Sequence, residues 1–416
     1  MDLSEPTARP GASILALGAW TVSLAAIVAV DGTPGWRVAR ALVVIAIGVG
    51  AVWVERRHRR SSGFVALALG SVGIVVGGVL GIRFLAAGSI GVRSIGGLVL
   101  VAAGLVLVVA GGHELTRDLG RGRLVAIPSR VLLVAVVVWT TFPAVLATNV
   151  PPIDRGSDTP AARGLVAEDV RFSAADGIEL AAWYVPSRNG AAVVVRHGAG
   201  STADDQLAQA SVLVAHGYGV LITDARGHGE SDGRAMDFGW YGDDDVVGAV
   251  SFLADRPEVD ADRIGVVGFS MGGEEAIGAI AADPRIRAVV AEGATGRTDA
   301  DQAWFDDVYG ARGRFQQALE WIEFTLTDLL TDASRPTPLA DAAAAAAPRP
   351  ILLVVAGGVA DEGHAAEHIH DGAPGSVTIW EVPGAGHIEG FATAPDEWES
   401  RVVGFLDDVL LSEPRR

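Results

Sequence analysis

Hydrophobic positions follow two different patterns in the two parts of this chain. In the first 150 residues they form long uninterrupted runs, each close to the length that crosses a bilayer. In the third run glycine recurs every four residues, at Gly73, Gly77 and Gly81, which favours close packing against another helix. We therefore expect an all-α membrane domain at residues 1–148 with about five transmembrane helices. The five runs are residues 13–30, 38–54, 64–82, 95–112 and 131–147.

Beyond a polar, proline-containing linker at residues 149–165, the runs become short and alternate with amphipathic segments. Such alternation predicts strands and helices in turn, and hence an α/β domain at residues 166–416. The expected strands are residues 169–173, 178–186, 191–196, 219–224, 263–268, 287–292, 351–356 and 376–382.

Charge follows the same division. Residues 1–150 contain 13 Arg and 6 acidic residues, whereas the remainder contains 19 Arg and 44 acidic residues. An acidic domain of this kind has nothing to neutralise phosphates, which argues against nucleic-acid binding. Arginines concentrate after the second and fourth runs, so the positive-inside rule predicts a multi-pass cell-membrane protein with an extracytoplasmic C-terminal domain. The chain has no cysteine, which excludes disulfides and a cysteine nucleophile.

Two pentapeptides match Gly-x-Ser-x-Gly. One is residues 268–272, centred on Ser270, and it lies between an expected buried strand and a small-residue helix. A strand, a tight turn and a helix are the context in which a serine hydroxyl becomes exposed as a nucleophile. The other, centred on Ser231, lies among charged residues with no helix after it. The sequence therefore indicates Ser270 as the nucleophile.

Residues 166–416 resemble the α/β-hydrolase superfamily, especially bacterial serine hydrolases similar to dienelactone hydrolases and to peptidases with the same core. The resemblance is carried, in the family's order, by four segments: residues 193–200, 224–231, the Ser270 elbow and 383–387. It implies an α/β-hydrolase fold, with an eight-stranded, mostly parallel sheet, flanking helices and a small helical cap inserted at residues 293–350.

The resemblance also implies the chemistry. A serine needs a base, and the base needs an orienting acid, in the chain order serine, acid, histidine. His387 matches the base and Asp361 best matches the acid, with Glu362 and Glu292 as alternatives. The backbone N–H groups of Ala199 and Met271 match the two oxyanion donors.

Three further features allow more than one interpretation. Arg196 is expected in a structural ion pair, with a substrate carboxylate as the alternative. The stripe Phe315, Leu319, Ile322, Leu326 and Leu329 is expected to pack on the core, with an acyl-binding lid as the alternative. His364 and His368 are one helical turn apart, but no carboxylate pattern accompanies them, so no metal or cofactor is expected.

Together these observations predict a membrane-anchored serine hydrolase that acts through an acyl-enzyme. Its substrate is expected to be a small-molecule or lipid-like ester, with an amide or peptide bond second, and its other partners are membrane lipids. The alternative is a non-catalytic membrane interaction protein with a hydrolase-like domain. A transporter is disfavoured because no run carries a mid-membrane acid.

Overall fold

A computed structural model describes residues 59–116 and 123–412, with isolated positions between residues 38 and 53. The chain forms two compact units. The first comprises Met1–Pro151 together with Leu319–Asp332, and the second comprises Pro152–Ala318 and Ala333–Arg416. A short piece of the C-terminal part of the sequence therefore belongs to the N-terminal unit.

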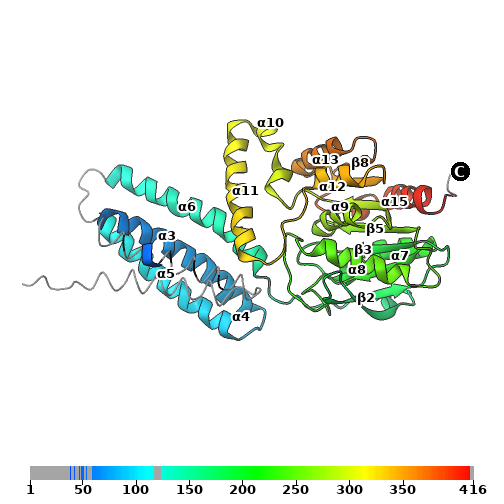
Figure 1. The fold of residues 1–416 in the computed structure, drawn as a ribbon, viewed down its shortest axis with the longest axis horizontal. Coiled ribbons are helices and arrows are strands. Elements are labelled where there is room, and N and C mark those ends of the chain that lie inside the picture. Colours follow the sequence, from blue (N-terminus) through cyan, green and yellow to red (C-terminus); the bar gives the residue numbers. More distant parts are fainter. Residues whose placement is uncertain are drawn as a thin grey trace, which may run out of the picture. The chain divides into compact units, whose positions relative to one another are not determined.

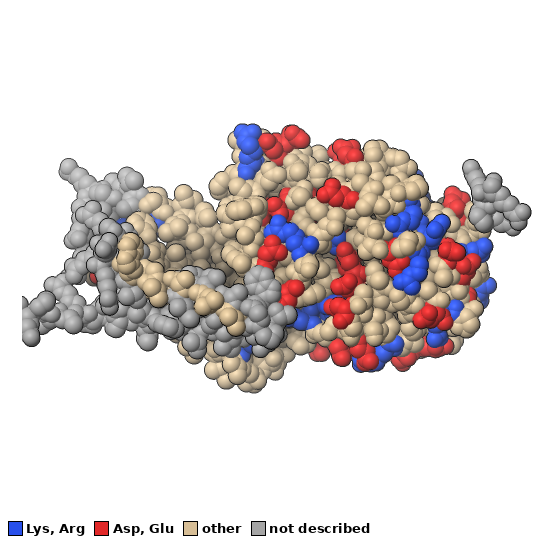
Figure 2. All heavy atoms as spheres, viewed as in Figure 1, with Lys and Arg blue, Asp and Glu red and all other residues tan. Residues whose placement is uncertain are grey.

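The described part of the first unit is helical (Figure 1), and most of its visible described surface is uncharged (Figure 2). Three stretches are long and apolar enough to cross a membrane: Ser62–Ala86, Val92–Leu115 and Pro128–Thr148. They coincide with the third, fourth and fifth predicted runs. The run 13–30 lies outside the described residues, and only scattered positions of 38–54 are described. The helices are α3 (Arg59–Gly78), the π-helical turn η1 (Val79–Arg83), α4 (Phe84–Ala86), α5 (Val92–Thr116) and α6 (Arg123–Thr148).

Glycines bring α3 and α5 together in antiparallel register. A Cβ on Gly70 would lie 2.8 Å from the carbonyl oxygen of Gly104, and one on Gly77 would lie 2.5 Å from that of Gly97. One heptad earlier on α3, the carbonyl oxygen of Gly63 lies 2.7 Å from where a Cβ on Gly111 would be. Because every larger side chain would push the backbones apart, these positions fix the register of the pair.

The second unit is built on one eight-stranded sheet in the order β1-β2-β4-β3-β5-β6-β7-β8. Strand β2 is antiparallel to both its neighbours, and all the other pairs beyond it are parallel. The predicted eight-stranded, mostly parallel sheet is confirmed. The strands are β1 (Glu168–Ser173), β2 (Glu179–Val185), β3 (Ala192–Arg196), β4 (Gly219–Thr223), β5 (Ile264–Phe269), β6 (Ile286–Glu292), β7 (Ile351–Ala356) and β8 (Val377–Val382).

Both faces of the sheet are covered, so the central strands are buried on both sides and read as continuous apolar runs. On β3, for example, Val194 belongs to one core cluster while Val193 and Val195 belong to the other. Helices α8 (Gly242–Ala254), α9 (Met271–Ala282), α12 (Leu339–Ala346) and α13 (Ala360–Gly372) cover the first face, and α7 (Leu207–Ala215) and α15 (Pro395–Leu410) cover the second.

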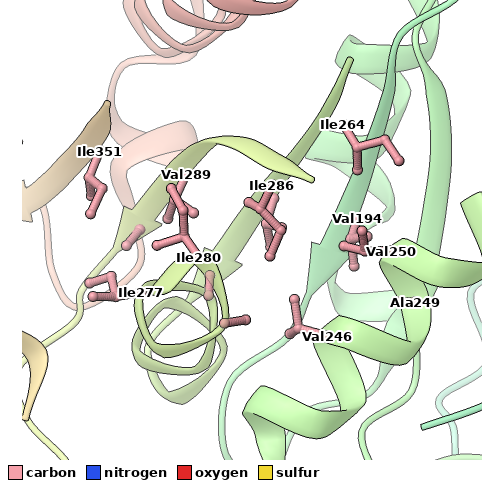
Figure 3. Close-up of a cluster of buried hydrophobic side chains, with 14 of the residues drawn as sticks. Val194, Val246, Ala249, Val250, Ile264, Ile277, Ile280, Ile286, Val289 and Ile351 are labelled. Atoms are coloured by element: carbon pink, nitrogen blue, oxygen red, sulfur yellow. The ribbon is translucent and has the colours of Figure 1, made fainter. Parts of the chain in front are cut away.

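Helix α9 is held by its apolar side chains. Ile277 and Ile280 lie against Ile286 and Val289 of β6 in the core of the first face (Figure 3). All four are fully buried, and each contributes about 1.5–3 kcal/mol relative to an exposed position. This packing fixes the helix that begins immediately after Ser270.

The segment at residues 293–350 contains α10 (Phe305–Tyr309), α11 (Ala311–Leu330) and α12. Helix α12 lies in the core of the second unit, where Leu339 is fully buried. Helix α11 departs from expectation, because Phe315 and Leu329 of its apolar stripe are 60% and 45% exposed. The interpretation of this stripe as core packing is therefore wrong for these two residues; the buried side of α11 includes Phe324 instead.

The remaining short elements are η2 (Ala161–Arg163), η3 (Ala203–Gln206), η4 (Asp299–Gln302) and α14 (Gly390–Thr393).

Candidate active site

Ser270 occupies a strained turn between β5 and α9. Its backbone angles are φ 51° and ψ −123°, a region that non-glycine residues rarely adopt. The turn is held because the Ser270 N–H donates to the Glu292 carbonyl oxygen at 2.7 Å. Ile388, next to His387, is the other described non-glycine residue with positive φ. Strain of this kind concentrates at functional sites.

The second glycine of the pentapeptide, Gly272, permits the tight packing of this turn. A Cβ on Gly272 would lie 2.5 Å from the His197 carbonyl oxygen and 2.6 Å from that of Arg196. Any other residue would force the helix away from β3. The Gly-x-Ser-x-Gly pattern thus corresponds here to a real steric requirement.

His387 follows β8 and faces the serine. Its Nε2 lies 2.9 Å from the Ser270 hydroxyl oxygen, although the two residues are 117 positions apart in the chain. The imidazole is 46% exposed on its side chain, so one side of it is open to solvent. The sequence prediction that Ser270 and His387 approach each other agrees with this geometry.

The acid beside His387 is Glu362. Its Oε1 lies 2.6 Å from His387 Nδ1, and its side chain is only 2% exposed. Its other oxygen accepts a hydrogen bond from the Ala356 N–H at 2.9 Å. The sequence favoured Asp361, and the structure corrects this choice: Asp361 is exposed and accepts a hydrogen bond from the Tyr309 hydroxyl.

The direction of the two acids follows from the phase of α13. Glu362, Ala365, Ala366 and Ile369 are the buried residues of this helix, at the spacing i, i+3, i+4 and i+7. Asp361 is one position, about 100°, away from that stripe. The apolar spacing around residue 362 was a readable signal, and it identifies the acid that points inward.

Glu292, the other alternative, is engaged elsewhere. Its two carboxylate oxygens accept hydrogen bonds from the Gly390 N–H at 2.8 Å and from Trp398 Nε1 at 2.9 Å. Burial raises the pKa of this carboxyl. Glu292 therefore holds the loop that follows His387 against α15.

Acidic neighbours favour the protonated form of the histidine. The hydrogen bond that His387 donates to Glu362 raises the pKa of His387 above its usual value, against the opposing effect of burial. Glu274 and Glu292 add smaller contributions in the same direction. Glu274 accepts hydrogen bonds from the Thr295 and Gly296 N–H groups, and its burial raises its own pKa to about 7. The site is thus suited to carry a proton on His387.

The two predicted oxyanion donors flank the serine. Met271 is the first residue of α9, where backbone N–H groups have no partner within the helix. Ala199 follows Gly198, and a Cβ on Gly198 would lie 3.0 Å from the Ser270 Cβ. Both residues therefore lie close to Ser270, and their role as oxyanion donors stays a prediction.

Arg196 is in an internal ion pair, the interpretation that the sequence favoured. The guanidinium is 1% exposed and contacts Glu275 at 2.5 Å and Asp245 at 2.6 Å. Asp245 also pairs with Arg226. These buried charges pair with one another, which agrees with a structural role for Arg196.

The second Gly-x-Ser-x-Gly copy serves the fold. The Ser231 hydroxyl donates to the Asp224 carbonyl oxygen and accepts from the Ala181 N–H, both at 2.8 Å. Since both contacts are internal, Ser231 fixes a loop against β2.

Comparison with known proteins extends these observations. Residues 187–345 match the sequence profile of the family described as serine aminopeptidase, S33; this range contains Ser270 and ends before Glu362. Among curated relatives, the thiohydrolase aneE of Aspergillus aculeatus is 34% identical over 126 residues, which are 29% of this chain and 40% of that protein. The polyketide transferase ATR5 of Stachybotrys chlorohalonatus is 36% identical over 129 residues, 30% of this chain and 43% of that protein.

The uncharacterized protein YfhR of Escherichia coli K12 is 31% identical over 132 residues, 30% of this chain and 46% of that protein. The matched segments thus span less than half the length of these relatives. Among solved structures, the Pyrococcus furiosus esterase Pf2001 is 25% identical with a TM-score of 0.49, over 62% of this chain and 97% of that one. The strand order, the serine turn and the family match together identify the second unit as an α/β-hydrolase fold.

Proposed function

We propose that this chain is a membrane-anchored serine hydrolase that cleaves an ester through an acyl-enzyme. The observation that carries the proposal is the continuous chain of contacts from Ser270 through His387 to the buried Glu362, at 2.9 and 2.6 Å. A serine hydroxyl is a weak nucleophile alone, and this arrangement supplies the base and the group that orients it.

In the first half of the reaction, the Ser270 oxygen attacks the ester carbonyl carbon while its proton passes to His387 Nε2. Glu362 holds the other ring nitrogen and stabilises the imidazolium that forms. The negative oxygen of the tetrahedral intermediate is stabilised by the N–H groups of Met271 and Ala199. The intermediate collapses, the C–O bond breaks, and His387 returns the proton to the leaving alcohol.

In the second half, water replaces the alcohol. His387 takes a proton from the water as it attacks the acyl carbon, and the second tetrahedral intermediate releases the acid and restores the Ser270 hydroxyl. The names of the relatives include a thiohydrolase and a polyketide transferase, which supports chemistry at an activated carbonyl. An ester of a small or lipid-like acid is the substrate class we propose.

Membrane anchoring rests on the three apolar helices of the first unit. Their register also supports an orientation. The contact between Gly63 and Gly111 puts the beginning of α3 and the end of α5 on one side of the bundle. In the sequence, the arginine-rich segments 56–60 and 117–130 adjoin these two helix ends. Among the described residues, the opposite end carries Arg83 and Arg93, and the end of α6 lies there, since Arg83 donates to the Leu146 carbonyl oxygen at 3.1 Å. The positive-inside rule then puts the hydrolase unit outside the cytoplasm.

A fluorophosphonate probe tests the nucleophile without knowledge of the substrate. Membranes that contain the wild-type chain should be labelled, and those with Ser270→Ala should not. Ser231→Ala is the matched control, since it removes the serine of the other pentapeptide, and it should keep the labelling. Labelling that persists in Ser270→Ala would exclude this serine as the nucleophile.

The orientation is tested separately by protease access in intact cells. Cleavage of the hydrolase unit from outside is the expected result, and full protection until the membrane is permeabilised would contradict the extracytoplasmic placement.

A further inference from the structure

Helix α11 is amphipathic in the opposite sense to a helix that packs on a soluble core. At about 100° per residue, Phe315, Ala318, Trp321, Ile322, Thr325 and Leu329 fall within one arc of about 120°. Phe315 and Trp321 on this arc are 60% and 56% exposed. A helix that packs on a core buries such side chains.

The buried side of α11 contains polar groups as well as the apolar Phe324. Glu323 is 7% exposed and Thr327 is fully buried, and both lie on the side opposite to the arc. Burial raises the pKa of Glu323 to about 8. A helix that leaves aromatic groups exposed while it buries a carboxylate is adapted to apolar surroundings on its outer face.

Apart from the Trp321 N–H, the polar side chains of the outer face have partners of their own. The Thr325 hydroxyl donates to the Trp321 carbonyl oxygen at 2.7 Å within the helix, so it needs no water. The one charged residue on the arc is Arg314, in the first turn, where its side chain pairs with Asp306 at 3.0 Å. A long arginine at a helix end can reach headgroups while the rest of the helix contacts lipid.

The first unit indicates which apolar medium covers this face. The second half of α11 belongs to that unit, and Leu330 at its end packs with Leu80 and Phe84. Leu80 is six residues before the end of the apolar stretch Ser62–Ala86, which corresponds to about 9 Å of helix. An interfacial helix buries its apolar face about 5–10 Å into the boundary between headgroups and acyl chains. The contact is therefore at the depth of that boundary.

We propose that the face of α11 formed by residues 315, 318, 321, 322, 325 and 329 lies against membrane lipid at the boundary between headgroups and acyl chains. Trp321 is the side chain best suited to that boundary, because its ring is apolar and its N–H is polar. The inference rests on the membrane anchoring in the proposed function, and it is independent of the hydrolytic chemistry. It places the segment that follows β6 in contact with the bilayer, and a lipid-like ester would be met there.

The absence of cysteine allows a direct test. Single cysteines at Ala318→Cys and Thr325→Cys would carry a nitroxide label in the full chain, reconstituted in vesicles of phosphatidylcholine and phosphatidylglycerol. Collision rates are measured with oxygen, which partitions into lipid, and with a water-soluble nickel chelate. Leu105→Cys, on an exposed position of α5 within an apolar stretch, is the lipid control. Asp371→Cys, whose native side chain is 83% exposed on α13, is the water control.

The expected result is an oxygen-to-nickel ratio at both α11 labels that exceeds the Asp371 ratio several-fold. A ratio equal to that at Asp371 would overturn the proposal, since the face would then lie in water. Protection from both reagents would also overturn it, because a protein surface such as a second copy would then cover the face. A water-like ratio at Leu105 would overturn the anchoring itself, whereas a lipid-like Leu105 with water-like α11 labels would reject the α11 inference alone.

Discussion

Replacing Glu362 by glutamine keeps the size of the side chain and changes what it presents to His387. In the native site the two oxygens of Glu362 accept from the Ala356 N–H and from His387 Nδ1. Glutamine has one oxygen and one NH2 group. The Ala356 N–H can only donate, so it retains the oxygen, and the NH2 group must then face Nδ1. His387 Nδ1 must then accept a hydrogen bond from this NH2 group, so the ring proton moves to Nε2. A protonated Nε2 can no longer take the proton of Ser270.

The expected loss follows from this tautomer change. Substitution of the orienting acid by its amide in a serine triad costs about 10⁴-fold in kcat, equivalent to about 5 kcal/mol of transition-state stabilisation. Asp361→Asn is the matched control at the neighbouring position. Asp361 is exposed and contacts Tyr309, so its substitution should change the rate by no more than a few-fold.

Two measurements on the purified full chain in detergent check the prediction: hydrolysis of a p-nitrophenyl ester and the rate of covalent labelling by a fluorophosphonate. Thermal melting of each variant establishes that it is folded at the assay temperature. A folded Glu362→Gln variant that keeps more than about a tenth of the wild-type rate, a loss of only 1.4 kcal/mol, would refute the tautomer argument. So would an equal loss in Asp361→Asn.

Three other outcomes are expected. Imidazolium cannot accept the serine proton, and the pKa of His387 is raised. The value of kcat/KM should therefore fall on acidification, with a midpoint above the ordinary histidine pKa of 6.5. A midpoint at or below 6.5 would contradict the geometry. Arg196→Met leaves the buried Glu275 without its partner, while Asp245 keeps Arg226. The hydrolase unit should be destabilised by about 3–5 kcal/mol, measured by chemical denaturation, and an unchanged midpoint would argue against the buried network. Gly77→Leu should disrupt the α3–α5 pair, since a Cβ at this position already meets a backbone oxygen. Gly78→Leu should be tolerated, because nothing lies within 4 Å of a Cβ there. Equal melting temperatures of the two variants in detergent would contradict the register of the pair.

The sheet and the serine could be predicted because their signals are local. Buried parallel strands have continuous apolar sequences, and Ser270 is marked by two glycines whose absence of side chains the turn requires. Their order along the chain then placed Ser270 and His387 at the same edge of the sheet. These predictions needed no knowledge of side-chain direction.

The acid required such knowledge. Asp361 and Glu362 are adjacent and chemically alike, so only the rotation of α13 decides which one enters the core. The order of the motifs favoured Asp361, whereas the apolar spacing from Ala365 to Ile369 indicates that Glu362 lies on the buried side of the helix. Helix α11 escaped prediction for a related reason: its apolar stripe was visible in the sequence, but periodicity does not tell whether such a stripe meets protein or another apolar medium.

The assignment of Leu319–Asp332 to the first unit means that the polypeptide passes between the two units three times. A fragment that starts at Pro152 would still carry the stretch 319–332, now without Leu80 and Phe84 beside it. Soluble expression of the hydrolase unit therefore calls for redesign of that stretch as well as removal of the N-terminal helices.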